Sequence, residues 1–100
     1  MKRFDSMITF CYTPDMERTH DFYSGVLELP MVLDQGGCRI YRVAGTGFIG
    51  FCSRKPAENP SGVTITFVTD DVDGWFERVK QAGCQVVKPP AETREYRIYN

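Results

Sequence analysis

Few side chains in this sequence could carry chemistry, and they are scattered along the chain. His20 is the only imidazole, and the four cysteines are Cys11, Cys38, Cys52 and Cys84. No two cysteines form a CxxC pair, and none is spaced from His20 as in a zinc finger. The Cys52 thiol could act as a nucleophile, but the pattern places no histidine beside it to take up its proton. Because no export signal is recognisable, we expect four separate buried thiols in a reducing cytosol rather than disulfides.

His20 belongs to a predicted amphipathic helix. The helix is expected to begin after Asp15, whose carboxylate can cap the first turn, and to end before Pro30. Spacings of three and four residues place an inward stripe on one helical face. This stripe consists of Met16, Thr19, His20, Tyr23 and Leu27, widened by Phe22 and Val26. His20 is therefore predicted to be a structural histidine against the back of a sheet.

Short strands surround this helix in the sequence pattern. β-branched and aromatic residues predict a strand at 7–13 and three more at 31–34, 38–44 and 48–53. The turn-forming segments 35–37 and 45–47 separate the last three, which must therefore form antiparallel hairpins. The polar segment 55–61 contains two prolines and is the predicted linker.

After this linker the order of elements begins again. A strand is predicted at 62–69, followed by a helix capped by Asp71 with Trp75 on its inward stripe and Gly83 as its C-cap. Short strands are expected at 84–88 and from 96 onward. Asp15 and Asp71 are 56 positions apart (71 minus 15). This internal repeat indicates one domain, 1–100, made of two modules at 7–54 and 62–100.

Composition excludes some partners. The chain has 42% hydrophobic residues, 25% charged residues and a formal net charge of -1. The charges form no polybasic stretch, and no apolar run reaches the length of a membrane span. We therefore expect a cytoplasmic protein that has neither nucleic acid nor membrane as a partner.

Two motifs carry a resemblance that covers nearly the whole chain. The first comprises Asp15, the Phe22-Tyr23 pair and the exit Val26-Leu27-Glu28-Leu29-Pro30. The second runs from Phe67 to Asp73 and continues at Ala82-Gly83-Cys84. In this order they resemble the vicinal-oxygen-chelate superfamily, which includes glyoxalase I, extradiol dioxygenases and bleomycin-resistance proteins. The resemblance implies an α+β fold of two βαβββ modules facing a small-molecule cleft.

Enzymes of this superfamily usually hold a divalent metal between the modules, and the resemblance assigns its ligand positions. They fall here at Ile8, Thr64 and about Gly50. Isoleucine and glycine offer no side-chain donor, and a threonine hydroxyl is a poor primary ligand. We therefore predict no metal and no cofactor. The resemblance also implies a further strand after residue 100, so the second module is expected to be incomplete at the C-terminus and the chain to form a homodimer.

The resemblance also implies which side chains line the cleft. Strand alternation in the family register predicts a mostly apolar and aromatic lining. Its members are Ile8, Phe10, Tyr12, Phe48, Gly50, Cys52, Thr64, Thr66 and Val68. These side chains could equally fill the space between the modules. Residues that could add polar contacts at the cleft mouth, or lie on the open surface, are Arg39, Tyr41, Arg42, Tyr96 and Arg97.

Three functions remain compatible with these features. The leading hypothesis is a metal-free protein that binds a small aromatic or amphipathic molecule in the cleft, as bleomycin-resistance proteins do. The alternative is a metal-dependent lyase or dioxygenase whose ligands are misaligned or lost with the C-terminus. The third is an assembly module. The sequence leaves open whether the protein is an enzyme, because fold alone fixes no reaction.

Overall fold

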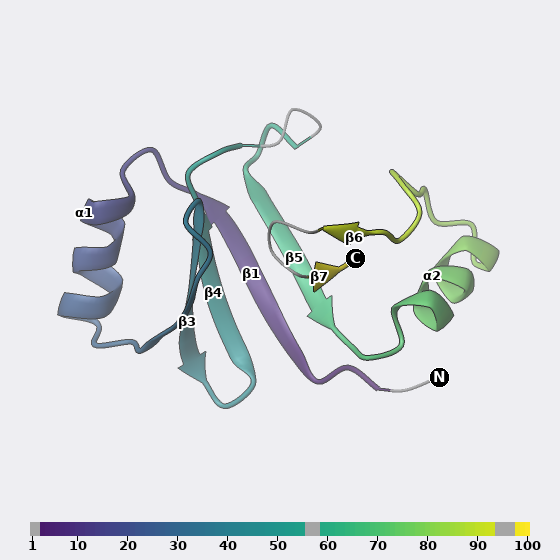
Figure 1. Ribbon diagram of the computed structural model, residues 1–100, viewed down its shortest axis with the longest axis horizontal. Helices are drawn as coiled ribbons and strands as arrows, with labels where there is room; N and C mark the ends of the chain where they lie inside the picture. Colours follow the sequence, from purple (N-terminus) through teal and green to yellow (C-terminus); the bar gives the residue numbers. More distant parts are fainter. Residues whose placement is uncertain (1–2, 56–58, 94–97) are drawn as a thin grey trace. The chain divides into compact units, whose positions relative to one another are not determined.

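The structure, a computed structural model, describes residues 3–55, 59–93 and 98–100. The chain divides into two compact units (Figure 1). One is Asp5–Val68, and the other combines Met1–Phe4 with Thr69–Asn100.

The first unit is built on a five-stranded sheet. Its strands are β1 (Ser6–Tyr12), β2 (Met31–Asp34), β3 (Cys38–Ala44), β4 (Gly47–Cys52) and β5 (Val63–Val68), in the order β2-β3-β4-β1-β5. β1 runs parallel to β4 and antiparallel to β5, whereas β2, β3 and β4 form consecutive antiparallel pairs. The predicted hairpins are therefore confirmed, with β-bulges in the β2–β3 and β3–β4 pairs. The boundaries of the two modules stay a prediction, because β5 pairs with β1 inside this unit.

The predicted helix after Asp15 is present but changes its winding. α1 (Met16–His20) continues directly into a π-helical turn, η1 (Asp21–Val26). In this turn the Leu27 N–H bonds to the Phe22 carbonyl, five residues back. The wider winding moves the last residues off the predicted stripe, and Phe22, Val26 and Leu27 are 46%, 68% and 47% exposed. The expectation that these three extend the buried stripe is therefore wrong.

The aromatic core of this unit lies between α1–η1 and one face of the sheet. α1 lies on one side of the strands in Figure 1. The Tyr23 ring lies 4.5 Å from the ring of Phe51, and Tyr41 is fully buried at 0% exposure. Side chains alternate along a strand, so the residues next to Tyr41 and Phe51 in sequence point to the opposite face of the sheet.

The second unit contains α2 (Val72–Gln81) and a pair of two-residue strands, β6 (Glu92–Thr93) and β7 (Ile98–Tyr99). Ala82 is the C-cap of α2, and Gly83, the predicted C-cap, follows it with a φ of 87°, the left-handed conformation that glycine favours directly after a helix. Trp75 of α2 stacks on Phe4 at a ring distance of 4.4 Å. The strand expected at 84–88 is wrong: this segment has no regular structure. Pro89 and Pro90 follow it and lack the N–H groups that a strand ladder needs.

The predicted repeat is visible in the hydrogen bonds at the two helix starts. Asp15 accepts a bond from the Arg18 N–H, and Asp71 accepts one from the Gly74 N–H. In addition, the hydroxyl of Thr13 accepts from the Asp15 N–H, and that of Thr69 accepts from the Asp71 N–H. Every atom of the second set lies 56 residues after its counterpart. The two modules thus begin their helices with the same capping arrangement.

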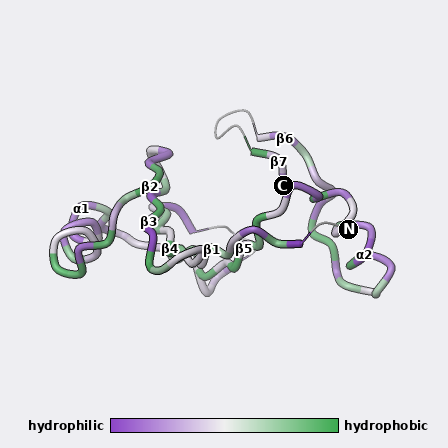
Figure 2. The backbone as a smooth tube through the Cα atoms, turned by 90° about the horizontal axis from the view of Figure 1, so that it is seen from below, coloured by the Kyte–Doolittle hydropathy of each residue, from purple (hydrophilic) through white to green (hydrophobic). Residues whose placement is uncertain are grey.

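The fold confirms the predicted α+β class. Within the described residues, the second half contributes β5, α2 and the short β6–β7 pair, with fewer strand residues than the first half. None of the described helices has the length and apolar character needed to cross a membrane. Accordingly, the hydrophobic stretches along the backbone are short and interrupted by polar residues (Figure 2).

Candidate functional site

The candidate site is the face of the five-stranded sheet opposite α1, here called the open face. Directly paired residues point to the same side of a sheet, and the register pairs Ile8 with Phe48 and Thr66, and Phe10 with Gly50 and Thr64. The same registers pair Tyr12 with Cys52 and Ser6 with Val68. All nine residues predicted to line a cleft therefore share this face. Whether a ligand contacts them stays a prediction.

In the middle of the open face, the aromatic ring of Phe10 lies over Gly50. A Cβ atom built on Gly50 would lie 2.5 Å from both Cδ1 and Cε1 of Phe10, closer than real Cβ contacts come. Gly50 is itself buried, whereas the Phe10, Phe48 and Ile8 side chains are partly exposed. The Phe10 ring therefore covers the Gly50 backbone. Together with Ile8, Tyr12 and Phe48 it forms a flat, apolar surface that solvent can reach, here called the aromatic floor.

The polar groups of this floor are few. The Thr64 hydroxyl accepts a hydrogen bond from Nδ2 of Asn59 at 3.0 Å, and the same nitrogen donates to the carbonyl of Val63. Asn59 is in turn oriented by Ser61, whose hydroxyl donates to its amide oxygen. Thr64 is thus held by its own loop, a contact that the sequence pattern did not reveal.

The donor set at the superfamily's metal positions does not fit a metal ion. Ile8 and Gly50 have no donor atom, the Thr64 hydroxyl is engaged by Asn59, and the ring of Phe10 lies over Gly50. Divalent metals are held by imidazole, carboxylate, thiolate or carbonyl groups. Among the described residues, no group of three or more histidine, cysteine, aspartate or glutamate side chains could hold a metal elsewhere.

Two cations lie over aromatic rings at the ends of the open face. The guanidinium carbon of Arg42 lies 5.5 Å from the centre of the Phe48 ring. The ammonium of Lys55 lies 5.2 Å from the centre of the Tyr12 ring. Both distances are in the range of cation–π attraction. Arg42 was among the residues predicted for the mouth of a cleft, whereas Lys55 was missed because it lies in the polar linker.

Two other mouth candidates, Tyr41 and Arg39, do not belong to this face. Tyr41 and Arg39 point toward α1, since they alternate with Ile40 and Arg42 along β3, and Tyr41 is buried against Tyr23 and Phe51. A position at the mouth of a cleft, one of the two alternatives left open for Tyr41 and Arg39, is therefore wrong for both. Tyr96 and Arg97 lie outside the described residues.

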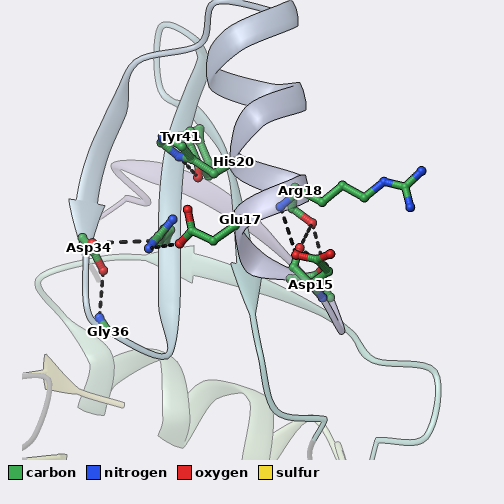
Figure 3. Close-up of polar contacts among 10 residues, drawn as sticks. Asp15, Glu17, Arg18, His20, Asp34, Gly36 and Tyr41 are labelled. Carbon is green, nitrogen blue, oxygen red and sulfur yellow. Dashed lines mark hydrogen bonds and ion pairs between the residues drawn. The ribbon is translucent and has the colours of Figure 1, made fainter.

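Arg39 ties α1 to the β2–β3 hairpin. It donates a hydrogen bond to Glu17 at 3.0 Å and pairs with Asp34 at 3.6 Å (Figure 3). The hydrogen bond to Glu17 is the main cause that raises the pKa of Arg39, so its guanidinium stays charged. Arg18, by contrast, extends away from this network in Figure 3.

His20 has a structural role, as the helix pattern predicts. Its Nδ1 lies 2.7 Å from the Tyr41 hydroxyl, on the α1 side of the sheet (Figure 3). Burial raises the pKa of Tyr41, while the charge of Arg39 and a hydrogen bond with it act in the opposite direction. The phenol of Tyr41 is therefore neutral around neutral pH, and its hydroxyl is hydrogen-bonded to Nδ1 of His20.

The expectation of four separate thiols is wrong. Cys38 and Cys52 form a disulfide across β3 and β4, with Cα atoms 4.1 Å apart. They face each other because the bulge between Arg42 and Ala44 sets a register in which Cys38 pairs with Cys52. Cys11 and Cys84 are free, and Cys84 is exposed rather than buried.

The second unit has a polar hollow at the start of α2, of about 350 Å³. It is lined by Thr69, Asp70, Asp71, Val72, Asp73 and Tyr99. Its carboxylates already serve the local structure, since Asp71 caps α2 and Asp73 accepts a hydrogen bond from the Tyr99 hydroxyl. That bond is the main cause that raises the pKa of Tyr99.

A mixed sheet with a parallel β1–β4 pair, a repeated capped helix and one open aromatic face defines an α+β protein built from related modules. The model of the Glyoxalase/Bleomycin resistance protein/Dioxygenase superfamily matches residues 7–99, and the chain belongs to this superfamily. The predicted resemblance is thereby confirmed.

Two solved structures share the fold. A hypothetical protein from Bacillus halodurans C-125 is 18% identical with a TM-score of 0.65, over 94% of this chain and 78% of that chain. A glyoxalase/bleomycin resistance protein/dioxygenase superfamily member from Vibrio splendidus 12B01 is 15% identical with a TM-score of 0.61, over 88% of this chain and 78% of that chain. No curated protein matches.

Proposed function

We propose that this protein is a metal-free member of the superfamily that binds a small aromatic or amphipathic molecule on the open face. The observation that carries the proposal is the Phe10 ring over Gly50, because it puts a flat apolar surface where the superfamily's enzymes place a carboxylate. The metal-dependent lyase or dioxygenase alternative is not favoured by any donor group at those positions.

The chemistry of the floor supports this choice of ligand. Phe10, Phe48 and Tyr12 offer ring faces or edges, and Ile8 adds aliphatic surface. Aromatic side chains interact favourably with further rings in stacked or edge-to-face geometry, beyond the effect of buried area. Small-molecule sites are typically apolar with a small number of polar groups that fix orientation. The Thr64 and Thr66 hydroxyls can supply that orientation.

The proposal is tested with a neutral aromatic probe, N-phenyl-1-naphthylamine, whose fluorescence rises in an apolar site. We expect saturable binding that Phe48→Ala weakens about five-fold, corresponding to roughly 1 kcal/mol for one lost aromatic contact. Phe22→Ala is the matched control, because Phe22 is a partly exposed phenylalanine on η1, away from the open face. Probe binding that ignores Phe48 and responds to Phe22 would contradict the proposal.

We also propose that the protein forms a homodimer. Within the described residues β5 pairs only with β1 and forms one edge of the sheet. Val63 and Ile65 on this strand are 48% and 58% exposed. Exposed apolar edge strands readily pair with another chain, and a second copy supplies a matching strand.

The cytoplasmic location stays a prediction. The Cys38–Cys52 disulfide weighs against it, since disulfides are rare in the cytosol.

A further inference from the structure

The charge distribution on the open face narrows the class of ligand. Arg42 lies above Phe48 and Lys55 above Tyr12, and both cations are exposed. In the part of the chain that the structure describes, neither makes an ion pair. Their positive charges are therefore available to a molecule that reaches the aromatic floor.

The two cations mark opposite ends of this floor. Phe48 and Cys52 are four residues apart on β4, and Cys52 pairs with Tyr12. At a rise of about 3.3 Å per residue the two ends are roughly 13 Å apart along the strands. Phe10 and Gly50 lie between them. This distance accommodates an aromatic system of two or three rings with a polar substituent at one end or both.

The described strand positions of the open face carry no carboxylate. Besides the nine predicted residues they include Cys38, Ile40, Arg42 and, from β2, Leu33. Two acidic residues, Glu17 and Asp34, lie on the other side of the sheet, where both pair with Arg39. The α1 side therefore has carboxylates that compensate its cation, whereas the charged side chain at the described strand positions of the open face is the cation Arg42.

We propose that the ligand of the open face is a planar aromatic anion, with a carboxylate, sulfonate or phosphate group. This inference rests on the proposed function and specifies its ligand class. The ring system stacks on the floor around Phe10, and the anionic group pairs with Arg42 or Lys55. A cationic aromatic molecule is disfavoured, because Arg42 near Phe48 and Lys55 near Tyr12 repel a further positive charge at this face.

The experiment compares two probes with the same ring skeleton. 8-Anilinonaphthalene-1-sulfonate carries a sulfonate that N-phenyl-1-naphthylamine lacks, and proflavine serves as a cationic aromatic probe. We expect the sulfonate to bind more tightly than the neutral amine and proflavine to bind most weakly. Added salt should weaken sulfonate binding and leave the neutral amine unaffected.

Single substitutions test whether Arg42 and Lys55 are the cations that bind the sulfonate. Arg42→Gln and Lys55→Gln should each weaken sulfonate binding about two- to five-fold, the range of exposed ion pairs, and should weaken it by a larger factor than they change the affinity for the neutral amine. Arg18→Gln removes the same charge from α1, where the side chain points away from the sheet, and should change neither affinity. Near-ultraviolet circular dichroism verifies that each variant is folded. Arg42→Lys replaces Arg42→Gln if the latter does not fold, and should retain sulfonate binding.

The outcomes separate this inference from the proposed function. If the neutral amine binds as tightly as the sulfonate, or proflavine binds best, the anionic ligand class is wrong and the aromatic site stands. Sulfonate binding that falls equally in Arg18→Gln also overturns the inference, since only overall charge would then matter. If neither naphthalene probe binds, the proposed function fails and this inference fails with it.

Discussion

The ring of Phe10 occupies the space into which any side chain at Gly50 would project, with only 2.5 Å between a Cβ and two ring carbons. We predict that Gly50→Ala lowers the free energy of unfolding by about 1–3 kcal/mol, because the ring must leave its position. Denaturation in urea measures this loss.

Gly25→Ala is the control for this prediction, because a Cβ atom added to Gly25 would meet no neighbouring atom within 4 Å. It should be neutral, or stabilising by up to about 1 kcal/mol, as expected for alanine in a helix. The double variant Gly50→Ala, Phe10→Leu should recover part of the stability. Equal stability of Gly50→Ala and Gly25→Ala would show that the ring does not constrain this position.

Metal content gives a second prediction. The positions Ile8, Gly50 and Thr64 lack suitable donors, so protein purified without chelator should contain well under one equivalent of zinc, nickel, iron or manganese by elemental analysis. Its thermal unfolding midpoint should also be unchanged by added zinc or by a chelator. One tightly bound equivalent whose loss lowers that midpoint would contradict the prediction.

The partly buried hydrogen bond between Tyr41 and His20 gives a third prediction. Tyr41→Phe should lower the free energy of unfolding by about 1 kcal/mol, the typical net value of one such bond. Tyr12→Phe, which alters an exposed ring on the open face, should change it by less than about 0.5 kcal/mol. Urea titrations at pH 7 compare the two variants.

Because the pKa of Tyr41 is raised in the folded state, the free energy of unfolding should depend on pH. The unfolded state ionises this phenol near its ordinary value of 10.0, whereas the folded state keeps it neutral to higher pH. The contribution of Tyr41 is therefore fully present below pH 10 and is lost as pH rises through the folded pKa. Tyr41→Phe should show a shallower loss of stability above pH 10 than the parent protein. Identical slopes would show that Tyr41 ionises equally in both states.

The disulfide between Cys38 and Cys52 gives a fourth prediction. It closes a segment with a sequence separation of 14, and its reduction should lower the free energy of unfolding by about 3 kcal/mol. Thiol titration of the denatured, unreduced protein should detect only Cys11 and Cys84. The variant Cys11→Ser, Cys84→Ser keeps the disulfide and should lose stability on reduction to the same extent. Four titratable thiols would contradict the pairing.

Assembly gives a fifth prediction. Sedimentation at micromolar concentration should show a dimer, and Ile65→Lys on the edge strand β5 should shift it toward monomer. Val43→Lys provides a control at another exposed apolar position, 55% exposed on β3. A stable, cooperatively unfolding monomer would refute the homodimer.

Sequence patterns predicted much of the fold, because helix capping and strand alternation depend on residues that are close in the sequence. Asp15 and Asp71 were identified as helix caps from residue type and from their position before a helical pattern. Strand alternation, in the register that the family resemblance implies, placed the nine open-face residues on one side. The disulfide could not be predicted in this way. It depends on the bulge near Arg42, which sets the β3–β4 register, and a register change of one residue would separate the two thiols.

The sequence and the family resemblance predicted which residues share the open face, but not how their side chains pack on it. The sequence placed Phe10 and Gly50 on the same face, yet only the packed side chains show that the ring covers the glycine. Tyr41 was expected at the mouth of a cleft or on the open surface, whereas its ring is buried next to Tyr23 on the α1 side of the sheet. Lys55 was missed because the linker pattern contains no information about the ring above which its ammonium lies.

The position of β1 in the sheet has a consequence for synthesis of the chain. β1 lies between β4 and β5, so residue 8 pairs with residues 48 and 66. A ribosome delivers β1 first and its partners 40 or more residues later (48 minus 8). β1 therefore leaves the ribosome with both edges unpaired, and its aromatic residues are open to chaperones or to other nascent chains until β5 has emerged. Substitutions that slow closure of this central strand should reduce the yield of folded protein more than they reduce its final stability.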